Sequence, residues 1–290
     1  MNGTIKKLAE PVQGLRLRNL VAMGFVSTVL VMNALPAQAD NLVVNGSFEI
    51  NGGSGQIGYN TTLADWSVPT PNGSYAFVYA PGSADVPGSV LSNYGENALW
   101  GPNDGSNNGL SAMSPDGGYY VALDGDFQIS ALSQTINGLT PGDSYTVGFW
   151  WAASQQYGFY GTTLQAMNVC LGNNVESYVD PGTQPLSGGA NASSNLNCDG
   201  SSGSTAVYTL PSNGFSGWQY QTFDLTANNT SDVLSFLAYG NVQLPPFALL
   251  DGVTLNADNS PVPEPGSLPL LFTGLMGGLA ILRSKKWLRR

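Results

Sequence analysis

Basic side chains are missing from most of this chain. No lysine, arginine or histidine occurs between Asn19 and Leu282, and all nine basic residues lie at the two ends. This absence excludes histidine-based catalytic triads, phosphate-binding P-loops and Schiff-base chemistry from the long central region. It also excludes salt bridges between side chains there. A buried carboxylate therefore needs backbone N–H groups, polar side chains, a metal ion or its own proton.

Acidic residues are the only charges in that region. The chain has 19 Asp and Glu residues, and only Glu10 and Glu264 lie outside residues 40–260, which leaves 17 acids and no bases there. A surface of one negative sign repels nucleic acid and anionic lipid, and it favours divalent cations. We therefore expect no nucleic-acid partner.

A short apolar run, residues 20–32, follows the N-terminal basic residues Lys6, Lys7, Arg16 and Arg18. The run is shorter than the roughly 20 residues that a membrane-spanning helix needs. It leads into the small-residue cleavage sequence Ala37-Gln38-Ala39. We therefore predict a signal peptide over residues 1–39 and a mature, exported chain from Asp40. The alternative is an uncleaved membrane anchor.

The C-terminus has three parts in a fixed order. A linker, residues 261–265, contains the stiff tetrapeptide Val262, Pro263, Glu264 and Pro265, in which each proline restricts itself and the residue before it. Residues 266–282 are apolar and lie at the lower length limit for a transmembrane helix. The basic tail, residues 283–290, is expected to stay in the cytoplasm.

This order of motif, span and basic tail resembles the PEP-CTERM sorting signal of Gram-negative bacteria. The resemblance implies that residues 262–265 are recognised by an exosortase, a membrane transpeptidase-like enzyme, and that the tail is discarded or exchanged after sorting. It further implies export through the inner membrane, a transient anchor there, and delivery to the cell surface or extracellular matrix near exopolysaccharide. The alternative is an ordinary C-terminal anchor preceded by a proline linker.

The chain contains only two cysteines, Cys170 and Cys198. In an exported domain they are expected to form a disulfide that closes a loop of about 28 residues. The alternative is a pair of free buried thiols. Zinc binding is not favoured, because the chain has no histidine and no further cysteine.

No sustained helical periodicity occurs between residues 40 and 260. Short alternating segments separated by Gly- and Asn-rich turns predict a single all-β domain over residues 40–260, an antiparallel β-sandwich or jelly roll. The predicted strands are residues 121–123, 128–136, 144–152, 163–171, 175–179, 205–210, 219–225, 233–239 and 248–255.

Three segments resemble galactose-binding-like jelly rolls, a fold shared by carbohydrate-binding modules and several bacterial surface domains. Residues 41–49 (NLVVNGSFE) resemble the opening strand of that fold. Residues 139–147 (LTPGDSYTV) resemble its central turn and strand, and residues 249–255 (LLDGVTL) its closing strand. The resemblance therefore implies a fold more than a ligand.

In many such jelly rolls, the Glu after the opening Phe and the Asp of the last strand help to bind a structural calcium ion. The resemblance implies that Glu49 and Asp251 take these roles here, with one structural calcium as the only cofactor. The chain departs from the pattern at Gly252, where the family often has a second Asp. The alternative is that both acids are exposed at strand ends.

Two further acidic motifs have more ordinary interpretations. Residues 104–109 (DGSNNG) match the first half of an EF-hand loop, but Pro115 stands where the bidentate Glu is needed, which favours a polar surface turn. Asp124 and Asp126 flank Gly125, and two neighbouring carboxylates suit glycoside hydrolysis. The Asp-Gly pair is also a strong hairpin-turn signal, and we prefer that interpretation.

Aromatic residues are the remaining candidates for recognition. Tyr157, Phe159 and Tyr160 lie in a glycine-flanked loop, and sugar rings stack on such aromatic faces, so this loop is a candidate glycan site. The loop follows Trp150 and Trp151, of which we expect one in the core and one outside because neighbouring strand residues face opposite ways.

The sequence as a whole predicts an exported, non-enzymatic β-sandwich that binds extracellular polysaccharide. A structural or adhesive matrix protein without a defined glycan ligand is the alternative, and a glycoside-active enzyme is a distant third.

Overall fold

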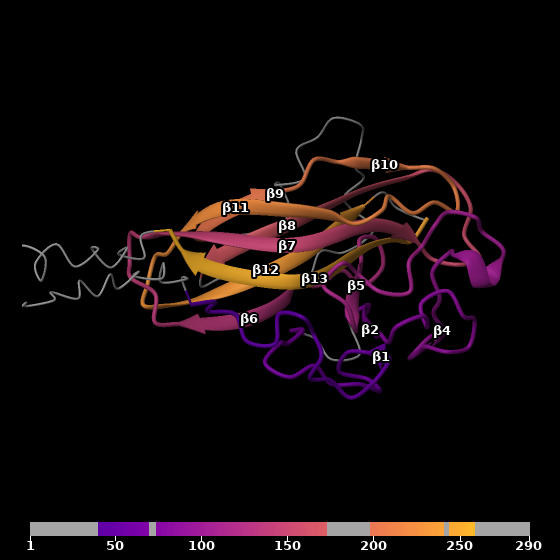
Figure 1. Cartoon of the computed structure of the whole chain (residues 1–290), viewed down its shortest axis with the longest axis horizontal. Coiled ribbons are helices and arrows are strands. Elements are labelled where there is room, and N and C mark those ends of the chain that lie inside the picture. The colour runs from indigo at the N-terminus through magenta and orange to yellow at the C-terminus, as the bar shows by residue number, and fades with distance from the viewer. Residues whose placement is uncertain (1–39, 70–73, 173–197, 241–243, 259–290) are drawn as a thin grey trace, which may run out of the picture. The chain divides into compact units, whose positions relative to one another are not determined.

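The computed structural model describes residues 40–69, 74–172, 198–240 and 244–258. Within these ranges the chain forms antiparallel strands, and one 3₁₀ turn, η1 (Pro102–Asp104), is its only helical element (Figure 1). The strands are β1 (Gly55–Gln56), β2 (Ala76–Tyr79), β3 (Leu91–Ser92), β4 (Gly95–Glu96), β5 (Tyr120–Asp124), β6 (Leu132–Asn137), β7 (Ser144–Gln155), β8 (Thr163–Gly172), β9 (Ser201–Ser204), β10 (Tyr208–Leu210), β11 (Gln219–Thr226), β12 (Ser231–Gly240) and β13 (Pro246–Ala257). The predicted all-β antiparallel fold is confirmed.

The larger sheet has six strands in the order β1-β2-β5-β13-β7-β11. The last strand, β13, therefore lies in the middle, where Leu249 stands opposite both Ala122 of β5 and Ala152 of β7. The register of β13 against β7 shifts between Asp251 and Thr254, which marks a β-bulge.

The second sheet has the order β10-β8-β12-β6, and β9 also pairs with β8. Just before β9, Cys198 forms a disulfide with Cys170 of β8, and the Cα atoms of the two residues are 5.8 Å apart. The predicted disulfide is confirmed. The bond secures β9 and β10 along one edge of β8.

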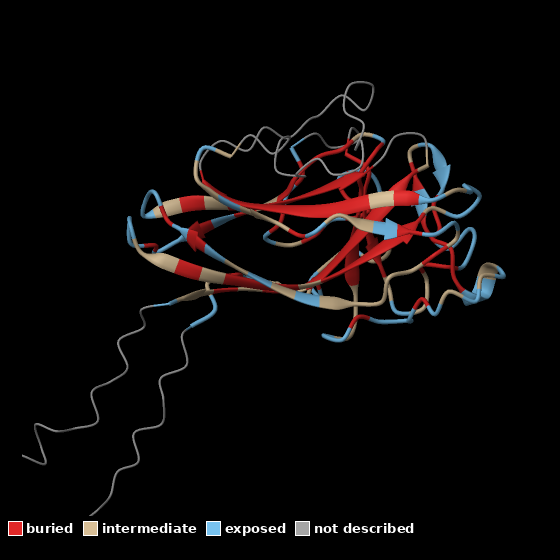
Figure 2. Ribbon diagram, turned by 90° about the horizontal axis from the view of Figure 1, so that it is seen from above, coloured by how far each residue is buried: buried red, intermediate tan, exposed pale blue. Residues whose placement is uncertain are grey.

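The main core lies between the two sheets. Alternate residues of each strand point into it, as period-2 geometry requires. In β5, Val121 and Leu123 face this core, and in β7 Phe149 and Trp151 do so. Figure 2 shows the long strands buried over most of their length, with exposed residues concentrated in loops and at strand ends.

A second core covers part of the outer face of the six-stranded sheet. The alternate residues of the same strands, such as Tyr120 and Ala122 of β5, pack there against Ala84, Leu99 and Leu110 from the long β2–β5 connection. Because both faces are covered, β5 is buried throughout, with the sequence YVALD. The sequence pattern predicted one sandwich and did not indicate this second layer.

The opening segment differs from its prediction. Residues 41–49 form no regular strand, because Asn45 and Phe48 adopt positive φ angles of 52° and 56°, which interrupt extended pairing. The segment still joins the closing strand, since the Leu42 N–H donates to the Leu255 carbonyl at 2.9 Å. Phe48 itself is fully buried against Trp66, with ring centroids 5.4 Å apart.

Most other strands agree with the sequence to within a few residues. The predicted strand 128–136 begins only at Leu132, and Gln128 before it has a φ of 49°. Of the predicted strand 205–210, only residues 208–210 form a strand, β10, while β9 lies before the predicted range and was not predicted. The turn at residues 139–143 is confirmed, with the Asp143 N–H donating to the Thr140 carbonyl at 3.1 Å.

Several predicted segments lie outside the described residues. They are the signal peptide (1–39), the strand 175–179, the linker 261–265, the transmembrane segment 266–282 and the basic tail 283–290. In the part of the chain that the structure describes, no helix has the length and apolar character needed to cross a membrane.

Candidate functional site

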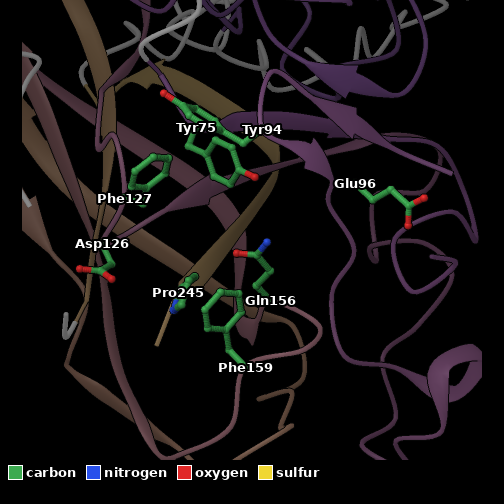
Figure 3. Close-up of a pocket in the computed structure, with 8 residues that line it drawn as sticks. All are labelled: Tyr75, Tyr94, Glu96, Asp126, Phe127, Gln156, Phe159 and Pro245. Atoms are coloured by element: carbon green, nitrogen blue, oxygen red, sulfur yellow. The ribbon is translucent and has the colours of Figure 1, made fainter. Parts of the chain in front are cut away.

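A pocket of about 370 Å³ opens at one end of the six-stranded sheet (Figure 3). Four aromatic rings, two acids, an amide and a proline line it. These residues are Tyr75, Tyr94, Glu96, Asp126, Phe127, Gln156, Phe159 and Pro245. They come from separate parts of the chain, yet each lies in or within four residues of a strand end.

The backbone ladder of the sheet positions the floor of the pocket. Tyr75 precedes β2, and its N–H donates to the Gln128 carbonyl at 3.0 Å while its own carbonyl accepts the Asp124 N–H at 3.0 Å. Gln156 follows β7, and its N–H donates to the Pro245 carbonyl at 3.1 Å. Backbone hydrogen bonds that continue the pairing just beyond the strand ends therefore hold these lining residues in place.

Three aromatic rings form one wall. Phe127 makes edge-to-face contacts with Tyr75 and Tyr94, at centroid separations of 5.4 and 5.1 Å. The Gln128 amide donates to the Tyr94 hydroxyl at 2.6 Å. Tyr94 is 60% exposed and Phe127 is 37% exposed, so ring surface remains available to a ligand. Such fixed rings supply contact area without a large loss of side-chain entropy.

The opposite side of the pocket carries Phe159, with Gln156 between the two sides (Figure 3). The Gln156 amide hydrogen-bonds to Tyr75, and burial raises the pKa of the Tyr75 phenol, which stays protonated and able to donate. Asp126 and Glu96 add carboxylates, the first buried and the second exposed. The pocket thus combines ring faces with a small number of polar groups.

Asp124 lies behind the pocket. Its Oδ1 accepts the N–H groups of Asp126 and Phe127 at 2.8 and 3.1 Å, while its buried Oδ2 has no hydrogen-bond partner. Burial raises the pKa of Asp124 well above its ordinary value, and the charge of Asp126 raises it further. Asp124 therefore fixes the turn that carries two lining residues and is expected to be protonated at acidic pH.

The aromatic loop predicted from the sequence is only partly at this pocket. Phe159 lines it. Tyr157 and Tyr160 instead pack on Trp100, at centroid separations of 4.6 and 5.2 Å. The Trp100 indole N–H donates to the Phe159 carbonyl at 2.8 Å, so this packing holds Phe159 in position.

Sequence reasoning missed most of the pocket. Tyr75, Tyr94, Phe127 and Gln156 share no spacing or motif, and Tyr75 precedes a strand that was not predicted. The one usable signal is that Gln156 directly follows the long strand β7 and Phe127 lies in the loop after β5, because binding residues often gather in such loops.

The two residues predicted to bind calcium lie near a common turn. Asp251 accepts hydrogen bonds from the Ser114 hydroxyl and from the Gly252 N–H. Glu49 Oε1 accepts the Tyr119 N–H at 2.7 Å. The predicted alternative, that both acids are exposed, fails for Asp251, which is fully buried.

The electrostatics of this turn suit a cation. Burial, aided by the nearby charges of Asp116 and Glu49, raises the pKa of Asp251 to about 8. Hard oxygen ligands of this kind are those that calcium prefers. Among the described residues, however, no group of three or more acidic, cysteine or histidine side chains is arranged to hold a metal ion. Calcium would therefore need backbone or water ligands beside Glu49 and Asp251.

The two other acidic motifs play structural roles in the described chain. In the EF-hand-like segment, Ser106 and Asn108 donate to backbone carbonyls, including that of Asn213. Asp124 and Gly125 do not form a hairpin, because Gly125 connects the two sheets, with its N–H donating to the Pro246 carbonyl at 2.8 Å and its carbonyl accepting the Gly240 N–H.

Several solved structures are similar to this chain, at low sequence identity. A CBM4 structure shares 16% identity, with 74% of this chain and 99% of that chain covered and a TM-score of 0.34. TmCBM61 in complex with β-1,4-galactotriose shares 16% identity over 76% and 100% of the two chains, with a TM-score of 0.32. The K1 cleaved adhesin domain of Lys-gingipain from Porphyromonas gingivalis W83 shares 12% identity over 73% and 96%, with a TM-score of 0.37.

No curated protein matches the chain. One family model does, over residues 261–286, and these residues include the predicted tetrapeptide, the whole apolar run and the start of the basic tail. The match indicates export followed by membrane-anchored sorting, and it implies processing by an exosortase. The C-terminus of this all-β protein is therefore a PEP-CTERM protein-sorting motif.

Proposed function

We propose that this protein is a non-catalytic carbohydrate-binding protein that holds extracellular polysaccharide at the cell surface or in the matrix. The observation that carries the proposal is the pocket with aromatic walls at the end of the six-stranded sheet. Its volume of about 370 Å³ falls within the range of roughly 300–1,000 Å³ that is typical of small-molecule sites.

The lining of the pocket matches the chemistry of a sugar. A sugar ring has C–H faces that pack on aromatic rings such as Phe127 and Phe159, and hydroxyl groups that hydrogen-bond to side chains such as Gln156 and Asp126. The absence of lysine, arginine and histidine between residues 19 and 282 disfavours an anionic ligand. A neutral or amine-bearing glycan is the class that fits both conditions.

The test is affinity electrophoresis of the full-length chain in gels containing β-glucan, galactan, xylan or bacterial exopolysaccharide. The double variant Phe127→Ala with Phe159→Ala is expected to lose most of the retention that the wild type shows. Tyr59→Ala is the matched control, because Tyr59 is 52% exposed but does not line the pocket. Full retention by the double variant would remove the pocket from the proposal.

The aromatic loop is tested separately with Tyr157→Ala and Tyr160→Ala. We propose that these residues support the site by packing on Trp100, so the expected loss of retention is smaller than that of the pocket variant.

Two other outcomes would favour the alternatives. If the chain shows no saturable binding to any glycan, a structural or adhesive matrix role fits better. If the chain releases reducing sugar from a glycan and Asp124→Asn abolishes that release, the protein is an enzyme.

A further inference from the structure

A second aromatic surface lies on the outer face of the six-stranded sheet, away from the pocket. Trp150 of β7 stands opposite Tyr220 of β11, and their ring centroids are 5.2 Å apart with an angle of 60° between the rings. Trp150 is half-buried and Tyr220 is 50% exposed. The neighbouring Trp151 faces the core, so the predicted division of the two tryptophans is confirmed.

Two glycines let these rings lie close to the sheet. A methyl group on Gly148 would overlap the Tyr220 hydroxyl, so the tyrosine lies across the bare backbone of β7. A methyl group on Gly252 would come within 3.1 Å of the Trp150 ring, and Gly252 has a φ of 59°. A glycine inside a strand weakens the strand, and it often marks a place of close approach.

Polar acceptors border the two rings. Asp224 lies on the same face as Tyr220, is exposed, and accepts a hydrogen bond from the Thr146 hydroxyl at 2.9 Å. Asp116 is exposed on the other side and lies beside Trp150 across Gly252. The border therefore offers carboxylate acceptors and, among the described residues, no basic group.

We propose that Trp150 and Tyr220 form a second glycan-binding platform, which takes a stretch of a neutral or amine-bearing polysaccharide. Sugar hydroxyls donate to the carboxylates of the border, and the C–H faces of the sugar rings pack on the two aromatic rings. The acidic border disfavours nucleic acid, whose bases also stack on aromatic rings, because its phosphates are repelled.

The platform is distinct from the pocket. Trp150 and Gln156 are six residues apart along β7, which corresponds to about 20 Å of extended strand. Between them, Ala152 is covered by the second core, which includes Trp218. The proposal takes its ligand class from the proposed function but does not require the pocket to bind.

The experiment measures retention of the full-length chain in the same polysaccharide gels. Tyr220→Ala is expected to weaken retention roughly three- to tenfold, as the loss of one aromatic contact implies. Tyr220→Phe keeps the ring and is expected to bind like the wild type. Thr226→Ala is the control, because Thr226 is exposed on the same strand at its far end.

Gly148→Ala provides an independent test. The added methyl group overlaps the Tyr220 hydroxyl and comes within 3.0 Å of the Thr254 hydroxyl, so it displaces the half-exposed Tyr220 ring while every aromatic residue remains present. We expect Gly148→Ala to be retained less strongly than the wild type and to have the same melting temperature as Tyr220→Ala.

The outcomes separate this inference from the proposed function. If the Phe127→Ala, Phe159→Ala variant keeps part of the retention, and adding Tyr220→Ala to that variant removes the rest, both sites bind. If the pocket variant alone abolishes retention and Tyr220→Ala has no effect, the platform is overturned and the pocket stands. If Tyr220→Ala changes the molecular mass in solution without changing retention, the surface is a protein interface and the inference is overturned.

Discussion

The Oδ1 atom of Asp124 accepts the backbone N–H of Asp126 at 2.8 Å, so an acid without a cationic partner holds a second acid at the edge of the pocket. The whole described domain shares this condition, since it contains carboxylates and no basic side chains. Its buried acids depend on N–H groups, hydroxyls and protons. This dependence leads to the first two predictions.

We predict that the calcium-free protein loses stability as the pH rises from about 4 to 8. Burial raises the folded-state pKa of Asp124 well above 3.8 and that of Asp251 to about 8. The unfolded chain therefore releases these protons first, so the stabilisation is complete below about pH 4 and is lost as the pH approaches the folded-state pKa. Thermal unfolding followed by circular dichroism in EDTA measures the trend.

Asp124→Asn identifies the contribution of one group to this trend. The variant has no proton to release there, so its stability is expected to fall less steeply with pH than that of the wild type. Asp65→Asn removes the same charge from an exposed position and is the control. Parallel pH profiles for Asp124→Asn and the wild type would contradict the prediction.

Calcium is predicted to raise the melting temperature through Glu49 and Asp251. A ligand at about 100 times its dissociation constant stabilises the folded state by about 2.7 kcal/mol. Glu49→Gln is expected to reduce the shift that calcium causes, while magnesium at equal ionic strength serves as the salt control. An unchanged melting curve in excess EDTA would rule out a structural calcium ion.

Removal of the disulfide is predicted to lower the free energy of unfolding by about 2–4 kcal/mol. The bond joins residues 28 positions apart, Cys170 and Cys198, and its loss frees the edge strand β9. Urea denaturation of Cys170→Ala with Cys198→Ala measures the change. Dithiothreitol should lower the stability of the wild type and leave that of the double variant unchanged. If dithiothreitol lowers the stability of both proteins equally, its effect does not come from this disulfide.

Gly46→Ala is predicted to destabilise the protein by about 1–3 kcal/mol, because the added methyl group overlaps the Val253 carbonyl of the closing strand. That carbonyl belongs to rigid backbone, so the opening segment must shift. Ser47→Ala, at the next position, is expected to change stability by less than about 0.5 kcal/mol. Denaturant unfolding of both variants compares them, and equal stability would show that the opening segment is not held against β13.

The sequence predicts those strands in which both the apolar alternation and the turn residues lie within the strand and its immediate neighbours in the chain. β7, β11 and β13 were found within three residues, because each combines an apolar alternation with flanking Gly, Pro or Asn residues. β2 was missed because its four residues, AFVY, are buried on both faces and show no alternation. The second core that buries them depends on the long β2–β5 connection, which has no periodic pattern of its own.

The site was less predictable than the fold. The sequence led to Phe159 because three aromatic residues stand close together in the chain, but Tyr157 and Tyr160 pack on Trp100. Tyr94 and Phe127 meet only after the chain has folded, 33 positions apart, so neighbourhood in the sequence gave no indication of their contact. Phe48 shows a different case, because it lies in a motif predicted to be a strand, is fully buried, and has a positive φ angle that no strand allows.

The position of β13 determines how the domain would bear a mechanical load. Pro245, directly before this strand, lines the pocket, and Ala257 ends the strand about 40 Å further along. If the C-terminus is tethered after sorting, as we propose, the tether pulls on the end of β13 that lies opposite the pocket. Tension between polysaccharide and tether would run along β13, which has β5 and β7 as partners on either side, and it would have to shear both ladders at once rather than peel an edge strand.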